Sequence, residues 1–172
     1  GYTYSFTEES VEGYSSNGPE TIDGVVTFTN TLDVQIIKCS TTETNVLGGA
    51  IFKLVKTSGE SGTYYGESQK DGIHTWYSTY ANSQLSNPIE SIPNGTYTLS
   101  EEKAPVGYLL SEEEWTVEVV NGKFVKFVKV KDANGNAITP QQLTPTMMTF
   151  TKADGSLQEG YAVCFANEVL YE

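Results

Sequence analysis

Residues 115–128 read Trp-Thr-Val-Glu-Val-Val-Asn-Gly-Lys-Phe-Val-Lys-Phe-Val, and this stretch decides the fold class. Apolar and polar side chains alternate on both sides of Asn121-Gly122, as they do in half-buried strands. An Asn-Gly pair suits a tight hairpin turn, because both central residues of the favoured turn need a positive φ. The stretch therefore predicts an antiparallel β-hairpin.

The same pattern recurs along the whole chain. Segments rich in Thr, Val, Tyr and Phe are separated by turns that contain Gly, Asn, Asp or Pro. The expected strands are 2–7, 25–30, 33–40, 50–57, 74–77, 95–102, 115–120, 123–131, 147–152 and 161–168. Only 79–86 is a candidate for a short helix, so the sequence predicts an all-β protein built as a β-sandwich.

Composition excludes several classes of function. The 172 residues carry 22 acids and 10 Lys without any Arg, for a net charge of -12. We therefore expect no binding of nucleic acid and no direct binding of membranes. The single histidine, His74, rules out a His-rich metal site and leaves a hydrolytic triad only one possible base. We expect no metal, no cofactor and no enzymatic turnover.

The polar stretch 57–71 contains three glycines and the adjacent pair Tyr64-Tyr65. It is typical of a surface insertion. As an alternative, Tyr64 and Tyr65 are candidate aromatic anchors that contact a ligand, since aromatic residues often dominate binding energy.

An internal repeat divides the chain. Residues 4–14 read Tyr-Ser-Phe-Thr-Glu-Glu-Ser-Val-Glu-Gly-Tyr, and residues 97–108 read Tyr-Thr-Leu-Ser-Glu-Glu-Lys-Ala-Pro-Val-Gly-Tyr. Each copy is followed by a strand that ends in a Phe-x-Asn element, at 28–30 and at 165–167. Two matched elements in the same order are a repeat signature.

Only the second copy has an upstream partner segment, which starts at Val34. We therefore expect 1–32 to be the C-terminal part of a preceding domain and 33–172 to be a complete domain.

Strand alternation places three polar side chains on core-facing rows. Side chains two apart in a strand share a face, so Lys38, Glu101 and Asn167 each end an apolar row. A buried charge must pair, hydrogen-bond or lose its charge. The three strands are therefore expected to bring these side chains together.

An amine, a carboxyl and a carboxamide in an apolar core can form an isopeptide bond. Burial lowers the pKa of a lysine and raises that of a glutamic acid. A neutral Lys38 amine could attack the Asn167 carboxamide while protonated Glu101 polarises the amide and shuttles protons as ammonia leaves. The alternative is a buried Lys38–Glu101 ion pair that Asn167 completes with hydrogen bonds.

Three motifs carry a family resemblance. They are Val34-Gln-Ile-Ile-Lys38, Leu47-Gly-Gly-Ala-Ile-Phe-Lys-Leu54 and Gly95-Thr-Tyr-Thr-Leu-Ser-Glu101-Glu-Lys-Ala-Pro-Val-Gly-Tyr108. Together they resemble the Cna-B/SpaA-type prealbumin-like domains of Gram-positive surface proteins and pilins. The resemblance implies a prealbumin-like, reverse-Ig-like β-sandwich.

In that family a Lys, a Glu and an Asn form a spontaneous isopeptide bond, and the roles fall on Lys38, Glu101 and Asn167. Glu102 follows Glu101 where the family often has Thr, but alternation directs Glu102 outward. In 1–32, Glu8 and Asn30 match the Glu and Asn of the family, and the matching Lys would lie upstream of this chain.

The resemblance also implies a role. It predicts a structural stalk module of a sortase-anchored adhesin or pilin, outside the cell and attached to the cell wall. The implied partners are neighbouring domains of the same protein, sortase and peptidoglycan. The alternative is an adhesin module that recognises a host protein or glycan through its aromatic loop residues.

Two further expectations come from spacing. The stretch 132–160 exceeds what a minimal domain needs and is expected to form an added hairpin. Cys39 and Cys164 lie on the faces opposite Lys38 and Asn167, diagonal or further apart. We expect that arrangement to exceed comfortable disulfide reach, which leaves the pairing of the two cysteines open.

Overall fold

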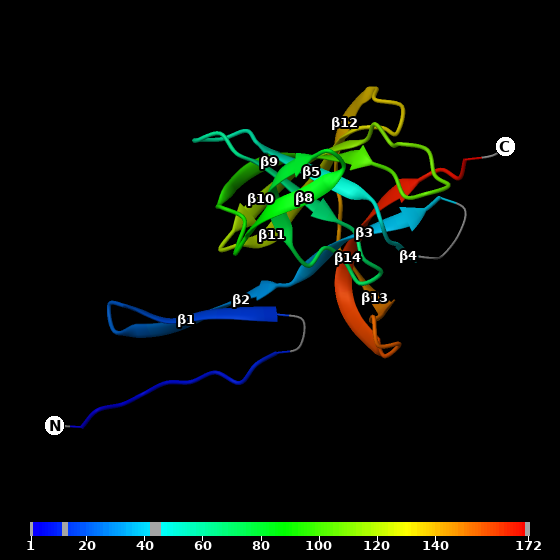
Figure 1. The fold of residues 1–172 in the computed structure, drawn as a ribbon. Coiled ribbons are helices and arrows are strands. Elements are labelled where there is room, and N and C mark those ends of the chain that lie inside the picture. The colour runs from blue at the N-terminus through cyan, green and yellow to red at the C-terminus, as the bar shows by residue number, and fades with distance from the viewer. Residues whose placement is uncertain (1, 12–13, 42–45, 171–172) are drawn as a thin grey trace.

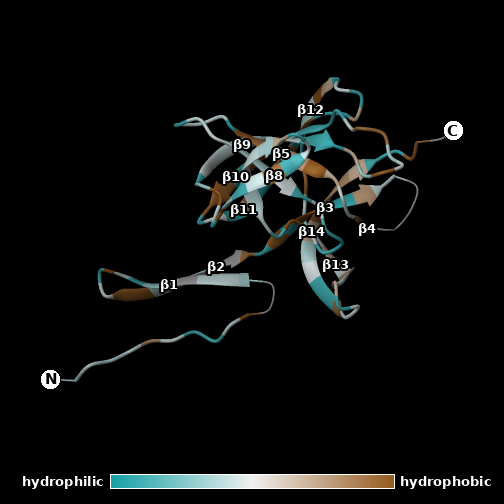
Figure 2. Cartoon of the chain, in the orientation of Figure 1, coloured by the Kyte–Doolittle hydropathy of each residue, from teal (hydrophilic) through white to brown (hydrophobic). Residues whose placement is uncertain are grey.

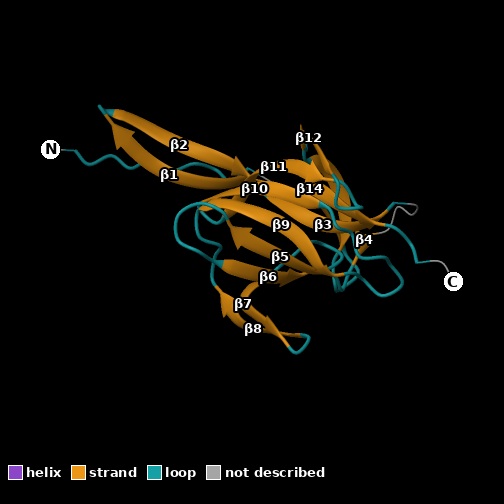
Figure 3. Cartoon of the chain, turned by 90° about the horizontal axis from the view of Figure 1, so that it is seen from above, coloured by secondary structure: helices purple, strands orange, loops and turns teal. Residues whose placement is uncertain are grey.

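The computed structural model describes residues 2–11, 14–41 and 46–170, and its regular structure there consists entirely of strands (Figures 1 and 3). The strands are β1 (Tyr14–Ile22), β2 (Val25–Leu32), β3 (Val34–Ser40), β4 (Val46–Leu47), β5 (Ile51–Lys56), β6 (Thr63–Glu67), β7 (Trp76–Ala81), β8 (Gln84–Ile89), β9 (Gly95–Lys103), β10 (Glu114–Val120), β11 (Lys123–Lys131), β12 (Ala137–Gln142), β13 (Thr146–Thr151) and β14 (Leu157–Asn167). The all-β prediction is confirmed.

The strands form three sheets. An eight-stranded sheet has the order β12-β11-β10-β9-β5-β6-β7-β8, and a four-stranded sheet has the order β13-β14-β3-β4. Within the described residues, β1 and β2 pair only with each other, and they extend away from the two larger sheets (Figure 1).

Residues 115–128 form the β-hairpin that their sequence predicts. Asn121 and Gly122 join β10 to β11 with φ values of 52° and 74°. Both values lie in the left-handed region that the favoured two-residue turn requires. Along β10, Trp115, Val117 and Val119 are buried, and these alternate residues form the core-facing row.

The main core lies between the two larger sheets and is rich in aromatic rings. Phe165 of β14 contacts Trp115 of β10 at a centroid distance of 5.0 Å and Phe52 of β5 at 5.2 Å. Trp115 also meets Phe127 edge-on at 6.2 Å. The contacts of Phe165 join the four-stranded sheet to the eight-stranded sheet, and edge-on or tilted rings are favoured pairings.

The strands β3 and β14 pair in parallel, although more than 120 residues separate their partners. Lys38 lies opposite Phe165, and Ser40 lies opposite Asn167. Parallel neighbours need a long crossover connection. Here nearly the whole eight-stranded sheet provides that connection, so the first strand of the sandwich meets its last.

Several local predictions are wrong. Residues 2–7 form no strand, and the candidate helix 79–86 is instead the end of β7, a turn and the start of β8. Asn82 and Ser83 form this turn with φ values of 52° and 57°. Pairing between β7 and β8 therefore outweighs a weak local preference.

The stretch 132–160 does not form one added hairpin. β12 pairs with β11 in the eight-stranded sheet, whereas β13 pairs with β14 in the four-stranded sheet. The chain crosses between the sheets at 143–145, where Pro145 cannot donate a ladder hydrogen bond.

The hairpin β1–β2 has an uncovered apolar end. Ile22 and Val25 flank its turn and are each 63% exposed, and Figure 2 shows hydrophobic colour at this far end. Near the sandwich, Ser15 Oγ donates a 2.7 Å hydrogen bond to Asp33. The hairpin therefore lacks the sheet partner that edge strands usually have.

Two truncations on β11 test which of its side chains lie in the core, since a bulge near 124–126 interrupts the alternation of this strand. Phe127 is 2% exposed, whereas Val125 is 42% exposed. Phe127→Ala should lower the free energy of unfolding by about 3–5 kcal/mol, because it removes a ring from the aromatic core. The control Val125→Ala should change it by less than about 0.5 kcal/mol. Denaturant titration measures both free energies of unfolding. Equal losses would contradict the placement of Phe127 in the core and of Val125 at the surface.

Candidate functional site: a buried lysine, glutamate and asparagine

Three strands bring Lys38, Glu101 and Asn167 into one buried cluster. Lys38 comes from β3, Glu101 from β9 and Asn167 from the end of β14. Their exposed fractions are 0%, 7% and 1%. A lysine and a glutamate this deeply buried are rare in proteins unless they are paired.

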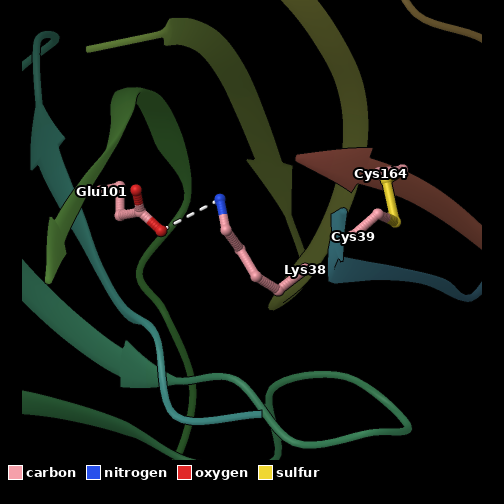
Figure 4. Close-up of a disulfide and its surroundings, with 4 residues drawn as sticks. All are labelled: Lys38, Cys39, Glu101 and Cys164. Carbon is pink, nitrogen blue, oxygen red and sulfur yellow. Dashed lines mark ion pairs between the residues drawn. A yellow bond between two sulfur atoms is a disulfide. The ribbon is translucent and has the colours of Figure 1, made fainter. Parts of the chain in front are cut away.

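Glu101 lies at the centre of the cluster. Its Oε1 is 3.0 Å from Lys38 Nζ, the ion pair drawn in Figure 4. Asn167 Nδ2 donates to both carboxylate oxygens, at 3.0 Å and 2.8 Å. The main-chain N–H of Ser111 donates to Oε2 at 2.9 Å. The carboxyl therefore contacts the amine and the amide nitrogen at the same time.

Aromatic rings surround the amine. Lys38 Nζ lies 4.2 Å from the centroid of Phe165 and 5.4 Å from that of Phe52. Burial among these groups lowers the pKa of Lys38 to about 8, although the charge of Glu101 opposes the shift. A larger share of the amine is therefore neutral, and thus nucleophilic, near neutral pH than for an exposed lysine.

In the carboxamide of Asn167, the nitrogen has hydrogen-bond partners and the oxygen has none among the described residues. Its nitrogen donates to Glu101 and, at 2.8 Å, to the carbonyl oxygen of Leu109. Its oxygen Oδ1 is buried and has no hydrogen-bond partner among the described residues. A buried carbonyl oxygen without a hydrogen bond lowers the stability of the fold, so the Asn167 side chain is only partly satisfied in its hydrogen bonding.

Sequence reasoning missed a second buried carboxyl. It lies in the acidic run 112–114, where Glu113 is only 5% exposed. Its Oε1 accepts a 2.6 Å hydrogen bond from Trp115 Nε1 and lies 3.4 Å from Lys129 Nζ. Alternation could have found it, because Glu113 lies two residues before the core-facing Trp115.

Tyr64 and Tyr65 do not lie in a surface loop. Both belong to β6 and are partly buried. Tyr64 packs against the main core and lies 6.2 Å from the ring of Tyr97, and Tyr65 lies 5.6 Å from the ring of Tyr80. The loop expectation is wrong here because cross-strand aromatic pairing stabilises a strand at this position.

Cys39 and Cys164 form a disulfide, which corrects the expectation that they lie beyond reach (Figure 4). They are diagonal neighbours, since Cys39 lies opposite Ala166 and Cys164 opposite Ile37. Their Cα atoms are nevertheless only 5.9 Å apart, inside the range that a disulfide spans. The error was to treat a diagonal pair on twisted strands as too distant.

The N-terminal pair Glu8 and Asn30 also makes contact. Asn30 Nδ2 donates to Glu8 Oε1 at 2.9 Å, and Ser16 Oγ donates to Oε2 at 2.6 Å. Both hydrogen bonds lower the pKa of the exposed Glu8 carboxyl, and the one from Ser16 has the larger effect. The contact resembles that of Glu101 with Asn167, but no lysine occurs in 1–33.

A separate cavity of about 680 Å³ opens between the sheets. Ile36, Trp76 and Phe124 contribute apolar lining, and neither Tyr64 nor Tyr65 borders it. Among the described residues no cluster of His, Cys, Asp or Glu has the makings of a metal site. The described part of the chain likewise contains no helix with the length and hydropathy needed to span a membrane.

Comparison with known proteins shows the family. The profile of the SpaA prealbumin-like fold domain matches residues 32–134, more than half of the chain. The chain therefore belongs to the SpaA prealbumin-like fold domain family. No curated protein sequence matches it significantly.

Several solved structures are similar to the chain. A C-terminal fragment of the pilus adhesin SpaC from Lactobacillus rhamnosus GG is 23% identical, with a TM-score of 0.41, over 94% of this chain and 60% of that fragment. The open conformation of SpaC is 22% identical, with a TM-score of 0.40, over 94% of this chain and 20% of SpaC. The pilus-presented adhesin Spy0125 (Cpa) is 20% identical, with a TM-score of 0.38, over 73% of this chain and 41% of that chain. The chain thus spans less than two thirds of each.

The disulfide predicts a simple thiol count. In denaturant without reductant, the chain should take up no iodoacetamide, because both thiols are consumed in the Cys39–Cys164 bond. After reduction it should take up two alkyl groups, as read by intact mass. Cys39→Ser serves as the control and should expose one thiol without reductant. Alkylation of both cysteines before reduction would contradict the disulfide.

Proposed function

We propose that this chain is a structural module of a Gram-positive surface protein, stabilised by an isopeptide bond that it forms itself between Lys38 and Asn167. The observation that carries the proposal is the buried contact of Glu101 with both the Lys38 amine and the Asn167 amide nitrogen. Family membership supports the surface role, since the similar solved structures are pilus adhesins.

The reaction balances within the three side chains. The lone pair of neutral Lys38 Nζ attacks Cγ of Asn167, and a new C–N bond forms. Glu101 accepts a proton from the attacking nitrogen and supplies one to Nδ2. The bond from Cγ to Nδ2 then breaks and ammonia leaves. Because Asn167 Nδ2 already donates to Glu101, the carboxyl lies beside the leaving group.

The bond replaces an unfavourable arrangement. Before reaction, Lys38 is 0% exposed and forms an ion pair with Glu101, and Asn167 Oδ1 is unpaired among the described residues. A buried ion pair contributes little net stability, because desolvation opposes the attraction. Converting the amine to an amide removes that charge from the core.

The stability that the Lys38–Asn167 bond adds depends on whether the disulfide is also formed. Alone, a link from Lys38 to Asn167 would stabilise the fold by roughly 5 kcal/mol in the chain-entropy model. With Cys39–Cys164 already joined, the same link closes a ring of about six residues and contributes roughly 2 kcal/mol. The distinct value of the amide is then that reduction cannot break it.

We place this module as a stalk domain at 33–172, after the C-terminal part of a similar domain at 1–32. The contact between Glu8 and Asn30 supports that division, because it repeats the contact between Glu101 and Asn167. Neighbouring domains, sortase and peptidoglycan are the proposed partners, and the proposed location is the outside of the cell wall. Tyr64 packs against the main core and Tyr65 against the ring of Tyr80, which favours this role over an adhesin module that binds a host protein or glycan through them.

The cross-link predicts a missing ammonia. The purified chain should have an intact mass lower than calculated by one ammonia, after correction for the disulfide. Lys38→Ala removes the nucleophile and Glu101→Ala removes the proton shuttle, so each variant should show the calculated mass. Loss of a second ammonia is not expected, because Glu8 and Asn30 have no lysine. A wild-type chain of full mass would refute the reaction.

The depressed pKa of Lys38 predicts how the rate of cross-linking depends on pH. Below pH 8 the amine is mostly protonated, so the first-order rate should rise about fivefold from pH 7 to pH 8. Above pH 8 it should rise by no more than about twofold. The rates come from chain that was purified in denaturant and has never folded, by mass spectrometry of samples quenched during its refolding. A tenfold rise per pH unit continuing to pH 10 would show an ordinary lysine instead.

A further inference from the structure

We propose that the Cys39–Cys164 disulfide positions Lys38 and Asn167 for amide formation. This inference rests on the proposed cross-link and adds two positioning residues to it. Neither cysteine is one of the reacting groups. Cys39 acts through β3, which carries Lys38, and Cys164 acts through β14, which carries Asn167.

The disulfide joins the same two strands as the proposed amide, beside the reacting pair. Cys39 follows Lys38 directly in β3, and Cys164 lies three residues before Asn167 in β14. Cys39 packs on the opposite face of the sheet, against the cluster of Ile37, Phe150 and Ala162. The disulfide therefore fixes the strands without occupying the side where the reaction takes place.

The regular pairing of β14 ends at the reacting residue. Asn167 is the last residue of β14, and beyond the ladder separate main-chain hydrogen bonds hold it, such as that from Thr41 N–H to its carbonyl oxygen. On its other side, β3 pairs among the described residues with the two-residue strand β4. Reacting atoms must lie about 3–3.5 Å apart, and a displacement of about 1 Å can lower a rate about 100-fold. A disulfide holds its Cα atoms within roughly 4.4–6.8 Å.

The two links also lean in opposite directions. Lys38 lies opposite Phe165, so the amide would reach two residues forward along β14 to Asn167. Cys39 lies opposite Ala166, so the disulfide reaches two residues back to Cys164. Sliding of β14 in one direction lengthens the first diagonal, and sliding in the other lengthens the second. The disulfide thus opposes slippage that the amide alone would permit.

Refolding of the full chain in two redox states tests the proposal. The chain is purified in denaturant from inclusion bodies, so that it has never folded, and its calculated mass confirms that it is unreacted. One portion is oxidised with glutathione disulfide, and a monomer with only two cysteines can then form only the Cys39–Cys164 bond. The other portion stays in reductant. After dilution, acid-quenched samples are weighed, and near-UV circular dichroism reports the folded fraction.

Among folded chains, the oxidised form should lose ammonia at least about tenfold faster than the reduced form. Cys39→Ser/Cys164→Ser should be slow in both conditions. Val46→Ala weakens the same cluster but keeps the disulfide, so its rate should match that of the oxidised wild type. The pH midpoint of the rate should be the same in both redox states, because positioning leaves the amine environment intact.

Each opposite result is decisive. Equal rates in folded oxidised and reduced chains would overturn the positioning role while leaving the cross-link intact. A pH midpoint that moves with the redox state would also overturn it, since the disulfide would then act on the charge of Lys38. Retention of the full mass in both states would overturn the cross-link and this inference together.

Discussion

The burial of one amine is the constraint on which the rest of this structure depends. Lys38 is 0% exposed between two aromatic rings, so the fold must supply a partner for its charge or remove the charge. Glu101 supplies the partner from the opposite sheet, and Asn167 completes the contact from the last strand. The parallel pairing of β3 with β14 follows the same requirement, because it delivers Asn167 to the first strand of the sandwich.

That pairing concentrates covalent chemistry at one place in the fold. The disulfide and the proposed amide join the same two strands, on opposite faces and along opposite diagonals. Their contributions to stability cannot be added, since either link already removes most of the loop entropy that the other would remove. We propose that the disulfide acts while the fold is assembling, and the proposed amide would persist under reducing conditions. A module with both links would keep its first and last strands together when it is pulled.

Period-two alternation predicted much of this from the sequence. It placed Lys38, Glu101 and Asn167 on core-facing rows, and the Asn121-Gly122 pair identified the central hairpin. Features that depend on sheet twist and long-range pairing were missed. The disulfide follows from how closely twisted strands bring a diagonal pair, and the strand at Tyr64 follows from its pairing with β5 and its packing against Tyr97. Glu113 was also missed, although it lies two residues before the core-facing Trp115 and so falls under the same alternation argument.

Tryptic mapping after reduction of the disulfide tests the central claim most directly, because it locates the bond rather than only counting ammonia. Trypsin cannot cleave after an acylated Lys38, and no lysine precedes it. If the cross-link forms, we expect a branched product in which 1–53 is joined to 153–172 through Lys38 and Asn167, even though the cysteines are reduced. Separate peptides 1–38 and 153–172, each with its calculated mass, would contradict the Lys38–Asn167 bond.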